Sequence, residues 1–338
     1  MKNRQKRRIS HSVRVGAALS TAAALLLAGC GLQSGGGSSD SGGGGESARP
    51  GSIERIEKLD GVKLVVGSKD FTEQLILGQM SIAILEAVGA EPVDKTQMTG
   101  TDQVRKALES GNIDTYWEYV GTAWEQHLQK DEKISSVDEM YDRVTAEDEK
   151  NGIVWLKPSP LINSYSLALS KENADRLGIT KMSELQSLDP SELTFCVGTE
   201  FYGRANDGYR PMLEHYDIKP GSVPSSQVNS MKDGLVYGEV ADGTDCNFAS
   251  TFTTDGRIAA NELVVLEDDE AFWPPYNVAV NINSDTFEKY PELADVFEPV
   301  SDELTTEQMQ ELTAQKDVEG KHERDVARDW LKEKGFIE

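Results

Sequence analysis

The ten residues TYWEYVGTAW (115–124) hold the densest group of side chains that could bind a ligand. Four of them are aromatic, in a chain whose aromatic content is 7%: Tyr116, Trp117, Tyr119 and Trp124. Grouped in this way they could form one wall of an aromatic pocket, and the following Gly-Thr turn would let a ligand approach the backbone. The same pattern fits the end of a buried strand, whose side chains alternate in direction. The segment alone leaves both interpretations open.

The N-terminus has the layout of a secretory signal over residues 1–29. A basic run, KNRQKRR, precedes an apolar stretch of small residues that ends at Cys30. The four residues from Leu27 to Cys30, LAGC, resemble the bacterial lipobox. This resemblance implies cleavage before Cys30, acylation of its sulfur, and attachment of the protein to the outer face of the cell membrane. Residues 30–60 then form a Gly/Ser-rich linker.

Two further cysteines, Cys196 and Cys246, lie in the strand-like segments LTFCVG and DCNFAS. Outside the cytoplasm an even pair of cysteines favours a disulfide. Two buried free thiols are the alternative. The separation of 50 residues, without a histidine nearby, argues against a metal site, and we expect neither a metal nor a cofactor.

The remaining chemistry of the sequence gives little support to an enzyme. The histidines are His11, in the signal, and three in polar, helix-like surroundings, His127, His215 and His322. Neither metal-ligand spacing nor a G-x-S-x-G motif occurs. An extracellular hydrolase is therefore a remote alternative.

The charge balance excludes one class of partner. Residues 1–29 hold six Lys and Arg and no acid, so the rest of the chain has 28 basic and 58 acidic residues. A surface this acidic repels the phosphates of nucleic acids.

Strands and helices alternate from residue 62 onward, which predicts an α/β fold. VKLVVGS (62–68), EPVDK and IDTYWEYV read as strands separated by helices, a doubly wound pattern in which ligands bind at the carboxyl ends of the strands. A second such set starts at LTFCVGTEF (193–201), a helix is predicted over 227–238, and residues from about 284 onward are helical. We expect two lobes, the first from 61–164 plus 276–338 and the second, 165–275, inserted in it. Two hinge crossings would join the lobes and let them close on a ligand.

Six segments occur in the order found in one protein family: GSKDFTEQLILGQM (67–80), YWEYVGTAW (116–124), NSYSLAL (163–169), EFYGRANDGY (200–209), FTTDGRI (252–258) and LEDDEAFWPPYNVAV (266–280). Together they closely resemble the substrate-binding proteins of osmoprotectant ABC importers, which capture glycine betaine, choline, carnitine or related quaternary amines. The resemblance covers about residues 60–338. It implies a type II periplasmic-binding-protein fold with the ligand held between the lobes.

The resemblance also implies an aromatic box around the ligand's trimethylammonium head. Such a head has no N–H group, so ring faces hold it through cation–π and apolar contact, at about 0.5–2 kcal/mol per ring. Carried over to this chain, the box consists of Tyr119, Tyr165, Phe252 and Tyr276. Phe252 is a departure, because the family pattern has Tyr at that place.

Donors for the ligand's carboxylate follow from the same resemblance. Lys69, Thr122 and Arg204 match the family's positions, and a guanidinium presents a planar fork to a carboxylate. Taken singly, such residues are more often a solvated loop lysine, a helix cap and a surface ion pair, and only the shared order of the motifs favours the donor roles.

The sequence therefore predicts a lipid-anchored, extracytoplasmic solute-binding protein rather than an enzyme. Glycine betaine is the expected ligand, with choline, carnitine and proline betaine next, delivered to an ABC permease and its ATPase. A protein of the same fold for another ligand, such as ergothioneine, is the main alternative. We expect a monomer.

Overall fold

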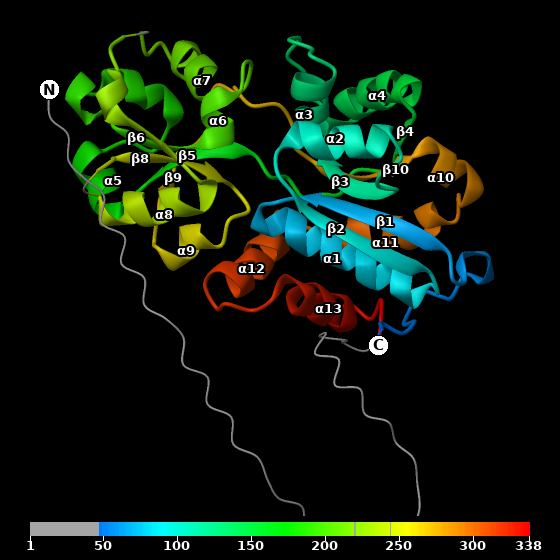
Figure 1. Ribbon diagram of the computed structural model, residues 1–338. Coiled ribbons are helices and arrows are strands. Elements are labelled where there is room, and N and C mark those ends of the chain that lie inside the picture. Colours follow the sequence, from blue (N-terminus) through cyan, green and yellow to red (C-terminus); the bar gives the residue numbers. More distant parts are fainter. Residues whose placement is uncertain (1–46, 220, 244) are drawn as a thin grey trace, which may run out of the picture. The chain divides into compact units, whose positions relative to one another are not determined.

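The structure, a computed structural model, has an α/β architecture with two mixed five-stranded sheets (Figure 1). It describes residues 47–219, 221–243 and 245–338. The predicted signal and Cys30, the predicted acylation site, lie outside the described residues. Within them, no helix is both long and apolar enough to cross a membrane.

The first sheet has the strand order β2-β1-β3-β10-β4. β2 and β3 run parallel to β1, whereas β10 is antiparallel to both of its neighbours, β3 and β4. The bounds are β1 Lys63–Lys69, β2 Glu91–Met98, β3 Thr115–Tyr119, β4 Ile153–Trp155 and β10 Val278–Asn283. All five residues of β3 are buried, so the aromatic stretch begins as a core strand.

The helices of this first lobe come from both ends of the chain (Figure 1). They are α1 Thr72–Ala87, α2 Thr101–Glu109, α3 Val120–Thr122, α4 Val137–Asp148, α10 Ser284–Lys289, α11 Leu293–Glu303, α12 Thr306–Asp317 and α13 Glu323–Glu333, with a π-helical turn at Ala123–His127. α1 contacts β1 and β2 on one side and α12 and α13 on the other. Because it is covered on both sides, fourteen of its sixteen residues are buried, which explains its nearly continuous apolar sequence.

The second sheet has the order β7-β6-β8-β5-β9. Its strands are β5 Tyr165–Leu169, β6 Phe195–Gly198, β7 Val228–Met231, β8 Phe248–Phe252 and β9 Val264–Val265. β7 and β8 run parallel to β6, and β5 is antiparallel to β8 and β9. The helices of this second lobe are α5 Lys171–Leu177, α6 Thr199–Gly203, α7 Tyr209–His215, α8 Asp233–Asp242 and α9 Arg257–Ala260.

One predicted element is wrong. The helix expected over 227–238 is instead the strand β7 followed by α8. β7 lies at the edge of its sheet and its residues, VNSM, are half-buried or exposed. A short polar edge strand has no apolar run to mark it, so the helical pattern of α8 was extended over it.

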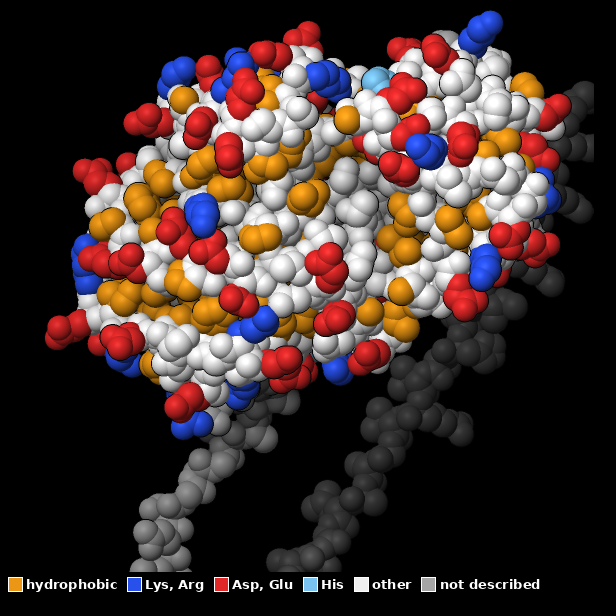
Figure 2. Space-filling view, turned by 180° about the vertical axis from the view of Figure 1, so that it is seen from behind, with side chains coloured by type: hydrophobic (Ala, Val, Ile, Leu, Met, Phe, Trp, Pro, Cys, Tyr) orange, Lys and Arg blue, Asp and Glu red, His pale blue; other side chains and the backbone are white. Residues whose placement is uncertain are grey.

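The chain passes between the sheets twice, between β4 and β5 and between β9 and β10. An isolated bridge pairs Ile162 with Asn277, so the two connecting segments lie side by side. The outer surface is acidic, as the composition requires: Figure 2 shows Asp and Glu side chains spread over the whole of one face.

Candidate ligand-binding site

A cavity of about 710 Å³ lies where the parallel strands of both sheets end. It is lined by the residues that follow β1, β2 and β3 in the first lobe and β6, β7 and β8 in the second: Asp70–Glu73, Thr99–Asp102, Gln126, Thr199, Glu200, Gly203, Arg204, Lys232–Gly234 and Phe252, Thr254, Asp255 and Arg257, together with Asn163 and Thr313. This position agrees with the rule that α/β sheets bind ligands at the carboxyl ends of their strands. Its volume is in the range of small-molecule sites.

Hydrogen bonds and an ion pair join the lobes beside this cavity. The Thr101 hydroxyl of α2 donates to Glu200 Oε1 of α6 at 2.8 Å. Arg257 of the second lobe pairs with Asp317 of α12 at 3.3 Å, and Asp317 also accepts from Thr72 at 2.7 Å. Side chains of the two lobes therefore contact each other beside the cavity.

The four rings predicted to form the box belong to one aromatic cluster, but only one of them lines the cavity. The ring centroids of Tyr165 and Phe252 are 5.0 Å apart, and those of Tyr165 and Tyr276 are 6.0 Å apart. Phe252 is half-buried and lines the cavity, whereas Tyr165 and Tyr276 are buried behind it. The structure therefore brings these rings together while exposing Phe252 alone.

Phe71 completes this cluster and was missed from the sequence. It lines the cavity and stacks on Phe252 at 5.4 Å, and its centroid is 6.3 Å from that of Tyr119. Phe71 comes from the first lobe and Phe252 from the second, so this stacked pair spans the two lobes. Its signal was available, because Phe71 stands directly after the first strand, where doubly wound folds place their ligand contacts.

Tyr119 is held by polar contacts on the protein side. Its hydroxyl donates to Glu73 Oε1 at 2.5 Å and accepts from Gln74 at 3.2 Å. The ammonium of Lys69 lies 5.1 Å from the centre of the Tyr119 ring. The ring that we expected to meet the ligand's cation thus already lies near a cation of the protein.

Lys69, a predicted carboxylate donor, does not line the cavity. Its side chain is buried and its ammonium lies 2.7 Å from Glu118 Oε1. The other Glu118 oxygen is 3.0 Å from both the Tyr116 hydroxyl and His127 Nε2. Burial alone would raise the pKa of Glu118, but the charge of Lys69 and the hydrogen bond with His127 lower it well below its usual range. The positive charge of Lys69 is balanced inside the first lobe.

Arg204 does line the cavity, but its guanidinium is already engaged. Nε donates to Asp207 Oδ1 at 2.8 Å and Nη2 donates to Asp207 Oδ2, while Nη1 reaches Glu200 at 3.3 Å. The guanidinium also lies 5.3 Å from the centre of the Tyr165 ring. The planar fork that we expected to hold a ligand's carboxylate holds that of Asp207.

Asp207 is a second residue that the sequence reasoning missed. Besides Arg204, it accepts hydrogen bonds from the Tyr276 hydroxyl and from Gln126 of the first lobe, at 3.2 Å. Its backbone carbonyl accepts from Trp273 Nε1 at 2.9 Å. The carboxylate is fully buried and connects both lobes and the second crossing. Its spacing of three residues from Arg204 was the available signal.

The predicted donor Thr122 is buried and does not line the cavity. The glycine before it, Gly121, approaches a side chain of the protein rather than a ligand. A Cβ placed on Gly121 would stand 2.7 Å from the Tyr276 ring and 2.8 Å from the Pro275 carbonyl oxygen. The glycine is therefore explained by packing against the second crossing.

Comparison with known proteins supplies the family. The model of the substrate-binding domain of ABC-type glycine betaine transport systems matches residues 62–333. The chain belongs to this family. A glycine-betaine-binding protein of Pseudomonas aeruginosa is 35% identical over 283 residues, which cover 81% of this chain and 89% of that protein.

Two further proteins that are similar to this chain help to place it. The apo structure of YehZ from Escherichia coli is 30% identical, covers 81% of this chain and 99% of its own, and superposes with a TM-score of 0.62. An ergothioneine transport permease and binding protein, EgtU of Helicobacter pylori, is 31% identical over 81% of this chain and 48% of its own length. The two-lobed fold is therefore that of the type II periplasmic binding proteins.

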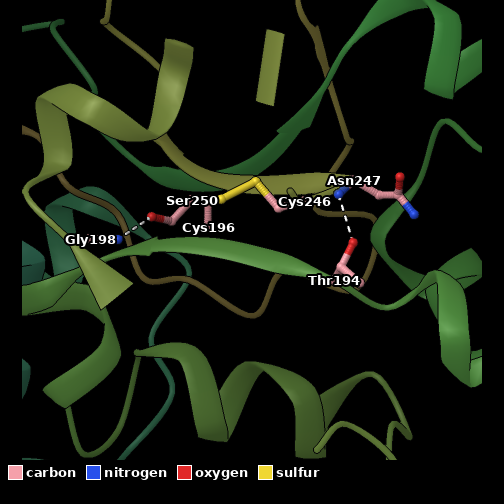
Figure 3. Close-up of a disulfide and its surroundings, with 6 residues drawn as sticks. All are labelled: Thr194, Cys196, Gly198, Cys246, Asn247 and Ser250. Atoms are coloured by element: carbon pink, nitrogen blue, oxygen red, sulfur yellow. Dashed lines mark hydrogen bonds between the residues drawn. A yellow bond between two sulfur atoms is a disulfide. The ribbon is translucent and has the colours of Figure 1, made fainter. Parts of the chain in front are cut away.

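The structure forms a disulfide between Cys196 of β6 and Cys246, which precedes β8 (Figure 3). Both cysteines are buried. On either side of the sulfurs, hydrogen bonds join the same two segments: Thr194 Oγ1 accepts from the Asn247 amide at 2.8 Å, and Ser250 Oγ accepts from the Gly198 amide at 2.9 Å. The covalent bond thus fastens two strands of the second lobe beside the loops that reach the cavity.

Proposed function

We propose that this family member captures a quaternary ammonium osmoprotectant and delivers it to an ABC permease and its ATPase. Glycine betaine is the first candidate, followed by choline, carnitine and proline betaine. The observation that carries the proposal is the aromatic cluster that reaches the cavity from both lobes. Ring faces are the groups that hold a methylated ammonium, because it has no N–H to donate.

In this proposal Phe71 and Phe252 supply the ring surface that the cation meets first. Tyr165 packs behind Phe252, and Tyr276 is fixed in turn by Asp207. A ligand that touches both phenylalanines touches both lobes and therefore favours the closed arrangement. The protein acts as a binding protein and carries out no reaction.

Replacing Phe252 with Ala tests this function. The loss of one cation–π contact, about 0.5–2 kcal/mol, corresponds to an increase of about 2- to 30-fold in the Kd for glycine betaine or choline, measured by titration calorimetry. Phe336→Ala is the matched control, because that ring packs on Trp330 and does not line the cavity. An unchanged Kd in Phe252→Ala would refute the aromatic site.

Ergothioneine is a second candidate ligand, because the relative from Helicobacter pylori is named for its transport. It also carries a trimethylammonium group and a carboxylate. Direct competition between ergothioneine and glycine betaine for the purified protein separates the two candidates. The ligand with the lower Kd is the assigned one.

We further propose that the protein is a monomer that acts outside the cytoplasm and is anchored by a lipid on Cys30. The support is the lipobox-like LAGC sequence and the Gly/Ser-rich segment that follows it. Cys30→Ala is expected to move the protein from the membrane fraction to the soluble extracytoplasmic fraction, as followed by immunoblotting of fractionated cells. Cys30→Ala protein retained in the membrane fraction would contradict the anchor.

A further inference from the structure

Glu73 is a buried carboxylate that lines the cavity. Its Oε1 accepts hydrogen bonds from the Tyr119 hydroxyl at 2.5 Å and from Asn163 Nδ2 at 3.1 Å. Its other oxygen, Oε2, has no hydrogen-bond partner among the described residues. Tyr119 and Asn163 therefore fix the carboxylate through one oxygen, and Thr254 is the remaining polar side chain near enough to influence it.

The neighbouring Asn163 also has one side-chain oxygen without a hydrogen-bond partner. Its side chain is buried and lines the cavity, Nδ2 donates to Glu73, and Oδ1 has no partner in the described part of the chain. The amide orientation follows from this contact, since a flipped amide would set two oxygens against each other. Two neighbouring side chains that line the cavity thus each carry a buried acceptor without a hydrogen bond from the described residues, which costs free energy unless a ligand compensates it.

The charges around the cavity have the sign that a cation requires. Six acidic residues line it, against three basic ones: Asp70, Glu73, Asp102, Glu200, Asp233 and Asp255 against Arg204, Lys232 and Arg257. Arg204 and Arg257 are each paired with a carboxylate, Asp207 and Asp255 respectively. No cation lies within ion-pair distance of Glu73 in the described ranges, although a buried carboxylate normally has one.

We propose that Glu73 is the anionic contact of the ligand's quaternary nitrogen and selects ligands for their positive charge. This inference rests on the proposed function and adds a specificity-determining residue to it. The methyl surface of the ammonium would meet Phe71 and Phe252 through their rings and Glu73 through its carboxylate. The rings recognise the shape and the polarizable surface of the head, whereas the carboxylate recognises its charge.

The protonation of Glu73 agrees with this role. Burial raises the pKa of its carboxyl, and the negative charge of Asp255 adds to the effect, while the side chains of Thr254, Tyr119 and Asn163 oppose it. The ionised form of Glu73 therefore costs more free energy here than in water, and a bound cation offsets part of that cost. Residues kept at a cost to stability are typical of binding sites.

The test replaces Glu73 with Gln, which keeps the shape and removes the charge, in the full-length protein. Two ligands of nearly equal shape are titrated by calorimetry: choline, and its uncharged analogue 3,3-dimethylbutan-1-ol. We expect the Kd for choline to rise at least about tenfold, which is about 1.4 kcal/mol, and the Kd for the uncharged analogue to change less than about twofold. The melting temperature of the unliganded variant is expected to equal or exceed that of the wild type.

Glu86→Gln is the matched control, because Glu86 lies on the same helix, α1, and pairs with Arg328 away from the cavity. It is expected to leave both affinities unchanged. If Glu73→Gln does not fold, Glu73→Asp keeps the charge and is expected to retain the preference for choline over the uncharged analogue.

The outcomes separate the inference from the proposed function. If the wild type binds choline and Glu73→Gln binds it equally well, or if both ligands lose affinity to the same extent, Glu73 does not recognise charge and the inference fails alone. If the wild type binds no quaternary amine, the proposed function fails and takes the inference with it.

Discussion

Replacing Asp207 with Ala is expected to lower the free energy of unfolding by about 3–5 kcal/mol, the usual effect of removing one partner of a buried ion pair. The Asp207 side chain is fully buried and that of Arg204 is 4% exposed, so the guanidinium would keep its charge without water or a partner. The Tyr276 hydroxyl and Gln126 would lose their acceptor in the same step.

The same change is expected to weaken ligand binding at least about tenfold, a loss of about 1.4 kcal/mol. Asp207 holds Arg204 against the Tyr165 ring and fixes Tyr276. The Tyr276 ring packs on Tyr165, which in turn packs on Phe252 at the cavity. Urea unfolding measures the stability and calorimetry the affinity. Asp302→Ala is the control, because its pair with Lys157 is exposed and such pairs contribute about 0–1 kcal/mol. Equal stability of the two variants would show that Asp207 does not organise the site.

Removing the disulfide is expected to have a comparable effect. Replacing Cys196 and Cys246 together with Ala frees a segment closed by a sequence separation of 50, which corresponds to about 4 kcal/mol in the chain-entropy account. The bond joins β6 to the segment before β8, so the second lobe is the part that loses stability. Urea unfolding under non-reducing conditions compares the double variant with the wild type.

A chemical check accompanies this prediction. In the unfolded, non-reduced wild type Cys196 and Cys246 are both expected to resist alkylation. A reductant is expected to convert them to thiols that both react. Labelling of both cysteines without a reductant, or equal stability of the double variant and the wild type, would contradict the disulfide's role.

Much of the fold could be predicted from the sequence because local patterns of apolar and polar residues determine it. The buried β3 and the helices after residue 284 follow from apolar periodicity, which neighbouring residues determine. The edge strand β7 could not be predicted in this way, because its four residues are polar or half-buried and its only support is the parallel pairing with β6.

The candidate site also contains both residues that local motifs predict and contacts that only the folded chain creates. The rings of Tyr165, Phe252 and Tyr276 were found from motifs, and the structure gathers them in one cluster. Whether Lys69 can reach a ligand depends on Glu118. This residue is 49 positions away in sequence and becomes the partner of Lys69 only when β3 pairs beside β1. The charge of a side chain and its place in a motif predict which kind of ligand it could bind. They do not predict which group of the protein pairs with it in the folded structure.

Phe71 and Glu73 are cavity residues that the expected position of ligand contacts, after the carboxyl ends of the strands, could have predicted. Both stand in the quoted segment 67–80, just beyond the carboxyl end of β1, and both line the cavity. Tyr119 and Thr122, which the resemblance implies as ligand contacts, do not line the cavity.

The central claim is that the cavity binds a methylated ammonium through rings and a carboxylate. Titration calorimetry of the purified wild-type protein with glycine betaine, choline and glycine tests it most directly, because glycine shares the carboxylate of betaine and lacks the three methyl groups. We predict saturable binding of one quaternary amine per protein molecule and no measurable binding of glycine. Binding of glycine as tight as that of glycine betaine, or no binding of either quaternary amine, would contradict the account.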